Sequence, residues 1–218
     1  MPYSDEREYR AMNIAVRAPE EGEEGNKIVE GYATTFNQRY ELYSFDNVTV
    51  YESVEPTAFI DCDMSDVIMQ YDHRGRVFAR NSNGTLKLST DEHGLKVTAD
   101  LAGTQMGRDL YEEIRGGYTD KMSFGFTIRE KSREITENED GTVTVWQRIN
   151  KVKKLYDVSA VSIPANPNTN ITSLTRTADI NGEIEEVRKE IAARRERNKE
   201  RERLALRLKL LEVSNNDN

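Results

Sequence analysis

The first residue that could do chemistry is a histidine placed where an apolar run ends. His73 follows Val-Ile-Met-Gln-Tyr at 67–71 and the acid Asp72, at the point where the chain leaves a predicted buried strand. A side chain at a strand end is held by a rigid scaffold while it faces a reactant, which suits a general base. A histidine without a chemical role fits this position too, so both alternatives remain open.

The second candidate is a serine within a strongly alternating segment. Ser123 lies in residues 121–128, where Met, Phe, Phe and Ile alternate with Ser, Gly and Thr. Its own face carries only Gly125 and Thr127, and small neighbours let another backbone approach closely. A serine hydroxyl becomes a nucleophile when a base lies within hydrogen-bond reach. The alternative, a small serine packed beneath a covering helix, has the same pattern.

A third group must orient the histidine, and Asp157 is the candidate for it. This acid interrupts the otherwise apolar segment Leu-Tyr-Asp-Val-Ser-Ala-Val at 155–161. Buried acids rarely lack a partner, and a carboxylate that holds the tautomer of a histidine base completes a catalytic triad. A solvent-facing acid on an edge strand is the alternative.

Few other residues suggest chemistry. The second histidine, His93, lies in Asp-Glu-His-Gly at 91–94, a sequence typical of an exposed turn. One cysteine, Cys62, and two separated histidines do not make a zinc-ligand set. The glycine motifs that bind phosphates or dinucleotides do not occur. We therefore expect no metal and no cofactor.

Charge narrows the range of partners. The chain of 218 residues has a net charge of −8, and residues 183–212 carry 10 basic and 8 acidic side chains, so the remainder sums to −10. An acidic body argues against nucleic-acid binding. The absence of any run of 18 apolar residues predicts no membrane-spanning helix. The single cysteine excludes an intrachain disulfide and fits a reducing compartment.

The segments that contain these candidate residues, and most of the segments between them, are predicted strands. We therefore expect a mostly β fold with flanking helices, of the α+β class. Alternation predicts strands at 11–18, 27–36, 48–54, 67–71, 85–89, 95–101, 121–128, from 143 onward and at 155–163. Helical spacing predicts a helix near 105–116, and a shorter helix is expected near 56–62. Residues 37–47 look irregular.

The residue pattern changes after about residue 178, from strand-like alternation to helical spacing with many charged residues. Apolar residues recur at helical spacing from Ile180 to Ile191, and residues 194–203 contain none. We therefore expect a body at 1–178, with a core at about 11–175, and a charged helical tail at 179–218. A solvated helix, or one that pairs weakly with itself, is the simplest interpretation of the tail, and docking to a specific partner is the alternative.

Several short motifs, taken in order, resemble the prohead (capsid-maturation) proteases of tailed bacteriophages. They are Glu-Gly-Tyr-Ala at 30–33, Phe-Asn at 36–37, Asp-His at 72–73, Gly-Thr-Leu at 84–86, Gly-Leu at 94–95, Met-Ser-Phe-Gly-Phe at 122–126, Asp-Val-Ser at 157–159 and Pro-Ala at 164–165. The Asp-His and Ser-Phe-Gly motifs are specific in combination. The resemblance implies a serine endopeptidase whose fold, like that of the herpesvirus assembly proteases, is a closed or nearly closed β-barrel flanked by helices.

The resemblance also implies roles for individual residues. Ser123 is the nucleophile, His73 is the general base, and Asp157 holds the position of the orienting acid, where many members carry Glu. The herpesvirus relatives use a second histidine there, and only His93 could supply it in this chain. Residues 55–59, Glu-Pro-Thr-Ala-Phe, replace the usual Pro-Gly-Ala-Phe away from the catalytic positions. Amides after Phe126 or in residues 164–168 are the candidate oxyanion donors.

By resemblance, the substrates are the scaffolding region of the phage major capsid protein and the protease itself, cleaved inside the procapsid in the host cytoplasm. The charged tail then suits scaffold binding during packaging, or homo-oligomer formation. The main alternative is a catalytically inactive procapsid assembly or scaffolding module, which would need neither Ser123 nor His73. A metal-dependent hydrolase is disfavoured by the scarcity of ligands.

Overall fold

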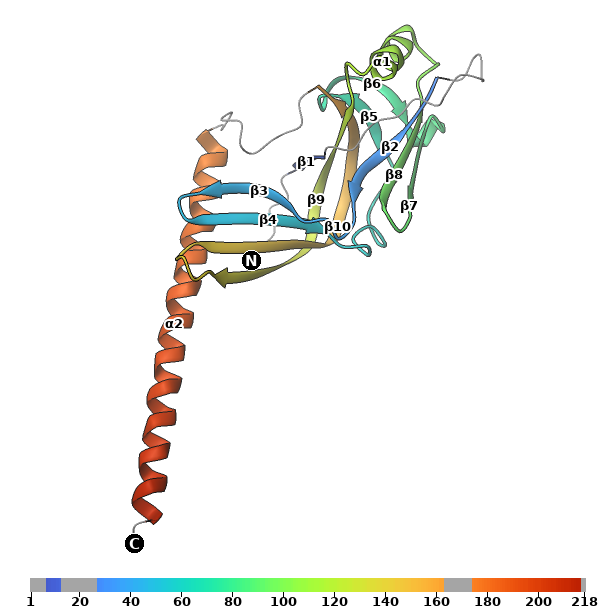
Figure 1. Ribbon diagram of the computed structural model, residues 1–218. Helices are drawn as coiled ribbons and strands as arrows, with labels where there is room; N and C mark the ends of the chain where they lie inside the picture. Colours follow the sequence, from blue (N-terminus) through green and yellow to red (C-terminus); the bar gives the residue numbers. More distant parts are fainter. Residues whose placement is uncertain (1–6, 13–26, 163–173, 217–218) are drawn as a thin grey trace. The chain divides into compact units, whose positions relative to one another are not determined.

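The structure, a computed structural model, describes residues 7–12, 27–162 and 174–216 (Figure 1). The chain divides into two compact units, residues 1–169 and residues 170–218. Within the described residues, the first unit contains ten strands, the helix α1 and a short 3-10 helix, η1 (Asn81–Asn83), and the second contains the helix α2. The predicted class, mostly β with helices, is confirmed. The predicted boundary near residue 178 stays a prediction.

The strands form two sheets. The seven-stranded sheet contains β1 (Glu8–Met12), β3 (Tyr40–Phe45), β4 (Val48–Val54), β5 (Ile68–Tyr71), β6 (Arg74–Arg80), β9 (Lys121–Glu137) and β10 (Val143–Val161). The three-stranded sheet contains β2 (Ile28–Thr35), β7 (Leu86–Thr90) and β8 (Gly94–Asp100). Within the described ranges neither sheet closes on itself, so the predicted β-barrel is not confirmed.

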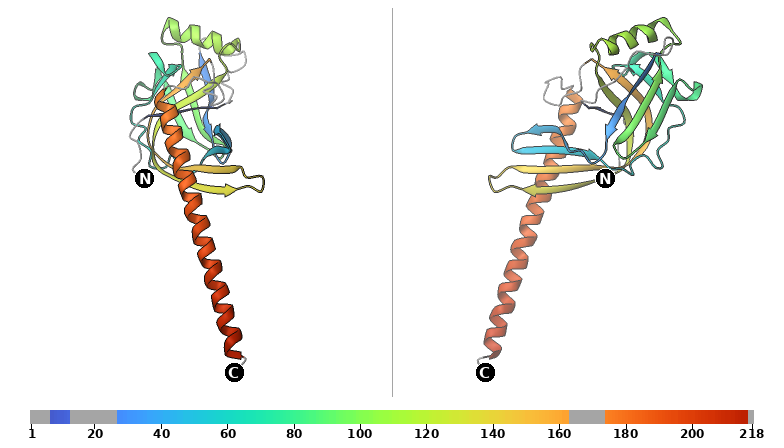
Figure 2. Two further views of the ribbon diagram at one scale, coloured as in Figure 1. Left: turned by 90° about the vertical axis from the view of Figure 1, so that its left-hand side faces the viewer. Right: turned by 45° about the vertical axis from the view of Figure 1, so that its right-hand side comes forward.

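The long antiparallel pair β9–β10 organises the larger sheet. Strand β10 pairs in parallel with β4 at one end and with β5 at the other, and β1 adds antiparallel to the free side of β9. The hairpin β3–β4 and the adjoining ends of β9 and β10 project from the rest of the first unit as an arm (Figure 2). The other end of the pair, near β1 and β5, holds the candidate site.

The hydrophobic core draws on both sheets. From β9 it takes Met122, Phe124 and Phe126, and from β8 it takes Leu95 and Val97, all fully buried. Complete burial of side chains of this size contributes about 1.5–3 kcal/mol each. This burial explains the alternation in residues 121–128, because the large residues enter the core and the small ones occupy the opposite face of β9.

The two α-helices agree with the expected pattern. Helix α1 (Gln105–Arg115) starts at Thr104, whose side chain accepts a hydrogen bond from the Gly107 amide at 3.0 Å, and it buries Leu110 and Ile114. Helix α2 (Leu174–Asn216) is 43 residues long. In the described part of the chain, no helix is both long enough and apolar enough to span a membrane.

Some local predictions were wrong. Residues 40–45, expected to be irregular, form β3, and residues 74–75, expected to belong to the loop after residues 67–71, already begin β6. The short helix expected near 56–62 is a series of turns over 56–61. The first strand starts at Glu8 rather than at residue 11, and the rest of its predicted range, 13–18, lies outside the described residues.

Candidate active site

The structure brings the three sequence-predicted residues into one hydrogen-bonded chain. The Nε2 atom of His73 lies 2.6 Å from the Oγ atom of Ser123, and Nδ1 lies 2.5 Å from Oδ1 of Asp157. His73 is 50 residues from Ser123 and 84 from Asp157 along the chain, so only the fold makes these contacts. The order serine, histidine, acid is the order that nucleophilic catalysis by serine requires.

Sheet register places the serine and the acid on the same face. In the β9–β10 ladder Ser159 lies opposite Ser123, and Asp157 lies opposite Gly125. Residues that lie opposite each other point to the same side of a sheet, and diagonal neighbours are within reach of a bridging side chain. Ser123 and Asp157 are such diagonal neighbours, and the imidazole of His73 spans the gap between them.

A tight turn carries the histidine. Asp72 and His73 connect β5 directly to β6, with φ angles of +48° and +57°. A two-residue hairpin with both φ angles positive is usually built from Asn, Asp or Gly, so Asp72 suits this turn, whereas the left-handed region costs His73 about 1–2 kcal/mol. The Asp72 carboxylate anchors this turn, since it accepts hydrogen bonds from the amide and the hydroxyl of Ser162 at 3.0 and 2.9 Å.

The surroundings of Asp157 determine the tautomer of His73. The carboxylate is fully buried, and its Oδ1 atom also accepts a hydrogen bond from the hydroxyl of Ser159 at 2.9 Å. A carboxylate facing Nδ1 holds the proton on that nitrogen, which leaves the lone pair of Nε2 directed at Ser123. The site is therefore arranged for Nε2 to accept the hydroxyl proton.

Gly125 provides the space for the carboxylate. A Cβ atom at this position would lie 2.3 Å from Oδ2 of Asp157 and 2.8 Å from a ring carbon of Tyr9. Any side chain here must therefore displace the acid or the tyrosine. The Ser-Phe-Gly motif therefore needs a glycine at its third position, because a Cβ atom there would collide with the Asp157 carboxylate. The alternation of residues along the strand does not reveal this requirement.

We expect Gly125→Ala to lower the rate of the peptide cleavage that the resemblance implies about 10²-fold while the protein stays folded, because a shift of Asp157 by about 1 Å disturbs the position of His73. Rates on a peptide substrate and a thermal melt measure the two effects. Gly103→Ala, in an exposed turn with no atom within 4 Å of the added Cβ and no positive φ, is the control for a lost glycine. If Gly125→Ala cleaves at the same rate as the unmodified protein, Gly125 is not needed to make room for the Asp157 carboxylate.

Strand β1 and Arg7, the residue just before it, supply further contacts that the sequence did not indicate. The ring of Tyr9 lies 4.4 Å, centroid to centroid, from the imidazole of His73. The Nη1 atom of Arg7 lies 3.8 Å from Oδ2 of Asp157, and the Arg7 guanidinium stacks on Tyr156 at 3.9 Å. No local pattern predicts these contacts, because they depend on β1 pairing with a strand more than a hundred residues away.

The remaining candidates lie elsewhere. His93 lies in the turn before β8, with its ring against Tyr32 and its amide on the Asp91 carboxylate. Burial raises the pKa of the Cys62 thiol to about 11, so at neutral pH it is protonated and a poor nucleophile. Residues 164–168, proposed for the oxyanion site, lie outside the described residues.

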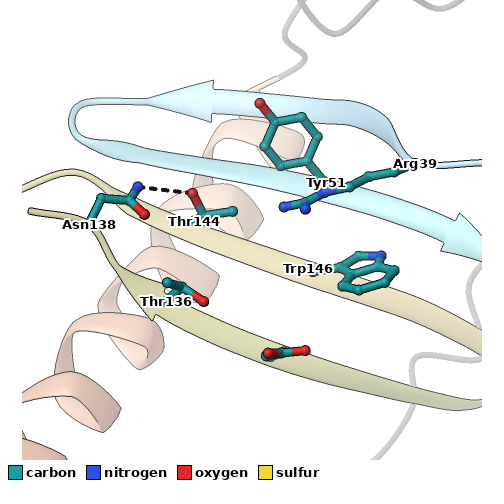
Figure 3. Close-up of a pocket in the computed structure, with 7 residues that line it drawn as sticks. Arg39, Tyr51, Thr136, Asn138, Thr144 and Trp146 are labelled. Atoms are coloured by element: carbon teal, nitrogen blue, oxygen red, sulfur yellow. Dashed lines mark hydrogen bonds between the residues drawn. The ribbon is translucent and has the colours of Figure 1, made fainter.

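A separate cavity of about 620 Å³ lies on the arm (Figure 3). Its lining residues are Arg39, Tyr51, Glu134, Thr136, Asn138, Thr144 and Trp146. Along β9, Glu134 is roughly 35 Å from Ser123 at the usual rise of a strand. The cavity therefore does not belong to the Ser123 site.

Comparison with known proteins gives one result. Residues 12–183 match the family model described as caudovirus prohead serine protease. No curated protein and no solved structure matches significantly. The matched range includes His73, Ser123 and Asp157.

Proposed function

Because the chain belongs to the caudovirus prohead serine protease family, we propose that it is a serine endopeptidase with Ser123 as nucleophile, His73 as general base and Asp157 as orienting acid. The observation that carries this proposal is the continuous chain of hydrogen bonds from Ser123 through His73 to the buried Asp157. A histidine in a strained turn, aimed at a serine on another strand, is costly to maintain without a chemical role.

The reaction follows from these contacts. As the Oγ atom of Ser123 bonds to the scissile carbonyl carbon, its proton moves to Nε2 of His73. Asp157 stabilises the resulting imidazolium through the proton on Nδ1. His73 then protonates the leaving amine as the C–N bond breaks. Water attacks the acyl-enzyme in the second half, with His73 again accepting and returning a proton, which releases the acid and free Ser123.

The family suggests the substrates and the location. Capsid proteins are its expected partners, and we propose the scaffolding region of the major capsid protein and the chain itself as the cleaved polypeptides, inside the procapsid. Co-expression with the capsid protein, followed by mass spectrometry of both chains, tests this. New termini on both proteins, formed also in the presence of a chelator, are expected. Intact masses would favour the inactive assembly module, and cleavage blocked by the chelator would favour a metal-dependent hydrolase.

The tail is proposed to act in packaging rather than in chemistry. The described part of α2 includes residues 194–203, where every side chain is polar or charged and exposed, and such a helix suits contact with a polar partner or a second copy. We expect a truncation ending at residue 178 to cleave peptide at an unchanged rate but to be absent from purified procapsids. Gel analysis of procapsids from cells expressing each form measures this, and normal packaging of the truncated chain contradicts it.

A further inference from the structure

A peptide backbone already lies beside the nucleophile. Ser123 is only 1% exposed, and its hydroxyl donates to the main-chain oxygen of Arg10, in β1, at 2.9 Å. In the β1–β9 ladder Ala11 lies opposite Ser123. A substrate carbonyl must reach the same hydroxyl, so the described arrangement leaves it no free approach.

The contact with Arg10 also competes with catalysis. The hydroxyl has one proton, and two acceptors lie within reach, Nε2 of His73 at 2.6 Å and the Arg10 oxygen at 2.9 Å. A proton donated to the Arg10 carbonyl is not available to the base. Moreover, a carbonyl oxygen that faces the nucleophile is not positioned for attack at its carbon. The arrangement is therefore a resting state, in which β1 occupies the site without being cleaved.

Strand β1 binds in the manner of an added peptide. It has five residues and pairs antiparallel with residues 122–126 of β9. In the order of the sheet within the described residues it is the outermost strand on that side. Extended peptides commonly bind enzymes and receptors by adding to a sheet edge in this way. Removing β1 would leave the edge of β9 open at the position of Ser123.

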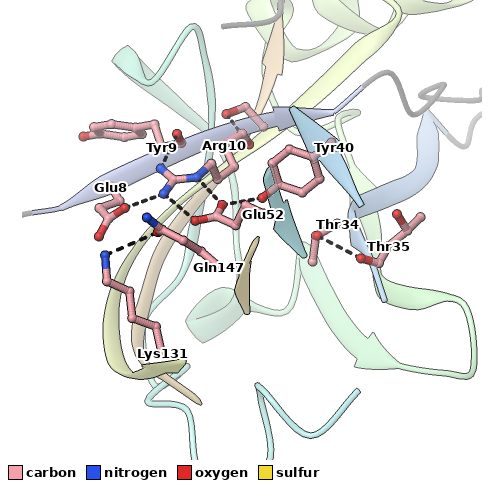
Figure 4. Close-up of polar contacts among 10 residues, drawn as sticks. Glu8, Tyr9, Arg10, Thr34, Thr35, Tyr40, Glu52, Lys131 and Gln147 are labelled. Atoms are coloured by element: carbon pink, nitrogen blue, oxygen red, sulfur yellow. Dashed lines mark hydrogen bonds and ion pairs between the residues drawn. The ribbon is translucent and has the colours of Figure 1, made fainter. Parts of the chain in front are cut away.

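The side chain of Arg10 holds β1 in place. Its Nε and Nη2 atoms bind the two carboxylate oxygens of Glu52 at 2.5 and 2.9 Å, and Nη2 also lies 2.5 Å from Glu8 (Figure 4). Glu52 is 1% exposed and accepts a further hydrogen bond from the hydroxyl of Tyr40 at 2.5 Å. A buried carboxylate that loses its cation becomes strongly unfavourable. Whatever replaces β1 must therefore supply a new cation to Glu52.

We propose that residues 122–126 of β9 bind the substrate as an antiparallel strand, that β1 occupies this edge in the resting enzyme, and that Glu52 selects a basic residue in the substrate. Since the carbonyl nearest Ser123 belongs to Arg10, the selected residue is the one that contributes the scissile carbonyl. This inference rests on the proposed function, and it adds the binding mode and the residue that determines specificity.

Two peptidyl diphenyl phosphonates test the proposal on the full-length chain. Both carry acetyl-Glu-Tyr, as in residues 8–9, followed by the phosphonate analogue of arginine in one probe and of norleucine in the other. Reaction forms a bond between Oγ of Ser123 and phosphorus, expels one phenoxide and passes the hydroxyl proton to His73. The rate of mass addition at Ser123 is measured for the unmodified chain, Glu52→Gln and Glu134→Gln. The last variant removes an exposed glutamate that pairs with Arg148.

We expect the arginine probe to label the unmodified chain and Glu134→Gln at least tenfold faster than the norleucine probe. In Glu52→Gln the two rates should lie within about threefold of each other, because the buried carboxylate that distinguishes them is gone. Equal labelling of the unmodified chain by both probes overturns the role of Glu52. Labelling of Ser123 by neither probe contradicts the proposed substrate mode when co-expressed capsid protein is still cleaved, and it contradicts the proposed function itself when the capsid protein stays intact as well.

Hydrogen exchange on the unmodified chain provides a second test that does not depend on a variant folding. In the free protein the alternate amides of residues 8–12 that face β9 should be protected by pairing with it. After complete labelling by the arginine probe, these amides should exchange at least tenfold faster, while residues 143–149, which pair β10 with β4, stay unchanged. Undiminished protection of residues 8–12 in the labelled protein shows that β1 is not in the substrate's place, and the proposal is then wrong.

Discussion

Ser123→Ala is expected to reduce peptide cleavage by about 10⁴–10⁶-fold, and His73→Ala by a similar factor, because the two groups act as a unit in forming the acyl-enzyme. Without Oγ there is no nucleophile, and without Nε2 at 2.6 Å nothing accepts the proton. The double variant should be no slower than either single variant. Single-turnover rates on a peptide, and the masses of the capsid protein and of the chain itself, measure the loss.

The chain offers a matched control for each substitution. Ser132 lies on the same strand, exposed and hydrogen-bonded to Asn150, so Ser132→Ala removes a β9 hydroxyl away from the site. His93→Ala removes the other histidine, which packs against Tyr32. Both controls should cleave at the normal rate. If His93→Ala is as slow as His73→Ala, the second histidine has a catalytic role that the geometry does not indicate.

Asp157→Asn has the second largest expected effect, a loss of about 10³–10⁴-fold in turnover with nearly unchanged volume. An amide cannot hold the proton on Nδ1 as a carboxylate does, so the imidazole presents its N–H rather than its lone pair to Ser123. The charge that stabilises the imidazolium is lost as well. The measurement is turnover on a peptide substrate, with circular dichroism to verify the fold.

Two comparisons make this second prediction specific. Asp66→Asn removes a carboxylate that is half exposed and paired with Arg80, and it should leave turnover unchanged. Asp157→Glu restores the acid but adds a methylene where the carboxylate already lies against Gly125, so it should recover only part of the rate. Asp157→Asn cleaving at more than half the normal rate contradicts the orienting role of Asp157.

Much of the site could be anticipated from local pattern. The alternation around Ser123 predicted its strand and the small-residue face, and the apolar run before His73 predicted a strand end. For the acid within an apolar segment the pattern left two alternatives open, a buried partner of the histidine and a solvent-facing acid, and the structure shows Asp157 buried, with 0% exposed. These features depend on residues close in sequence, so period-two spacing is enough to reveal them.

Other features could not be anticipated, for physical reasons. Strand β3 mixes Glu and Ser with aromatic residues and lacks a clean alternation, and β6 carries three arginines; both become strands because β4 and β5 offer partners. The turn at residues 72–73 contains no glycine, so its sharpness was hidden. The function of Gly125 depends on a carboxylate from the neighbouring strand, and the contacts of Tyr9 and Arg10 depend on where β1 pairs.

The sequence by itself determined the mostly β class, the two helices, the family resemblance and the identity of the three candidate residues. These properties follow from periodicity and from motifs a few residues long. Only the tertiary structure decided that His73 lies within hydrogen-bond distance of both Ser123 and Asp157, that Gly125 leaves room for the acid, and that β1 covers the nucleophile. The reason is that register between distant strands sets such distances, and a shift of one residue would turn Ser123 or Asp157 to the other face of the sheet.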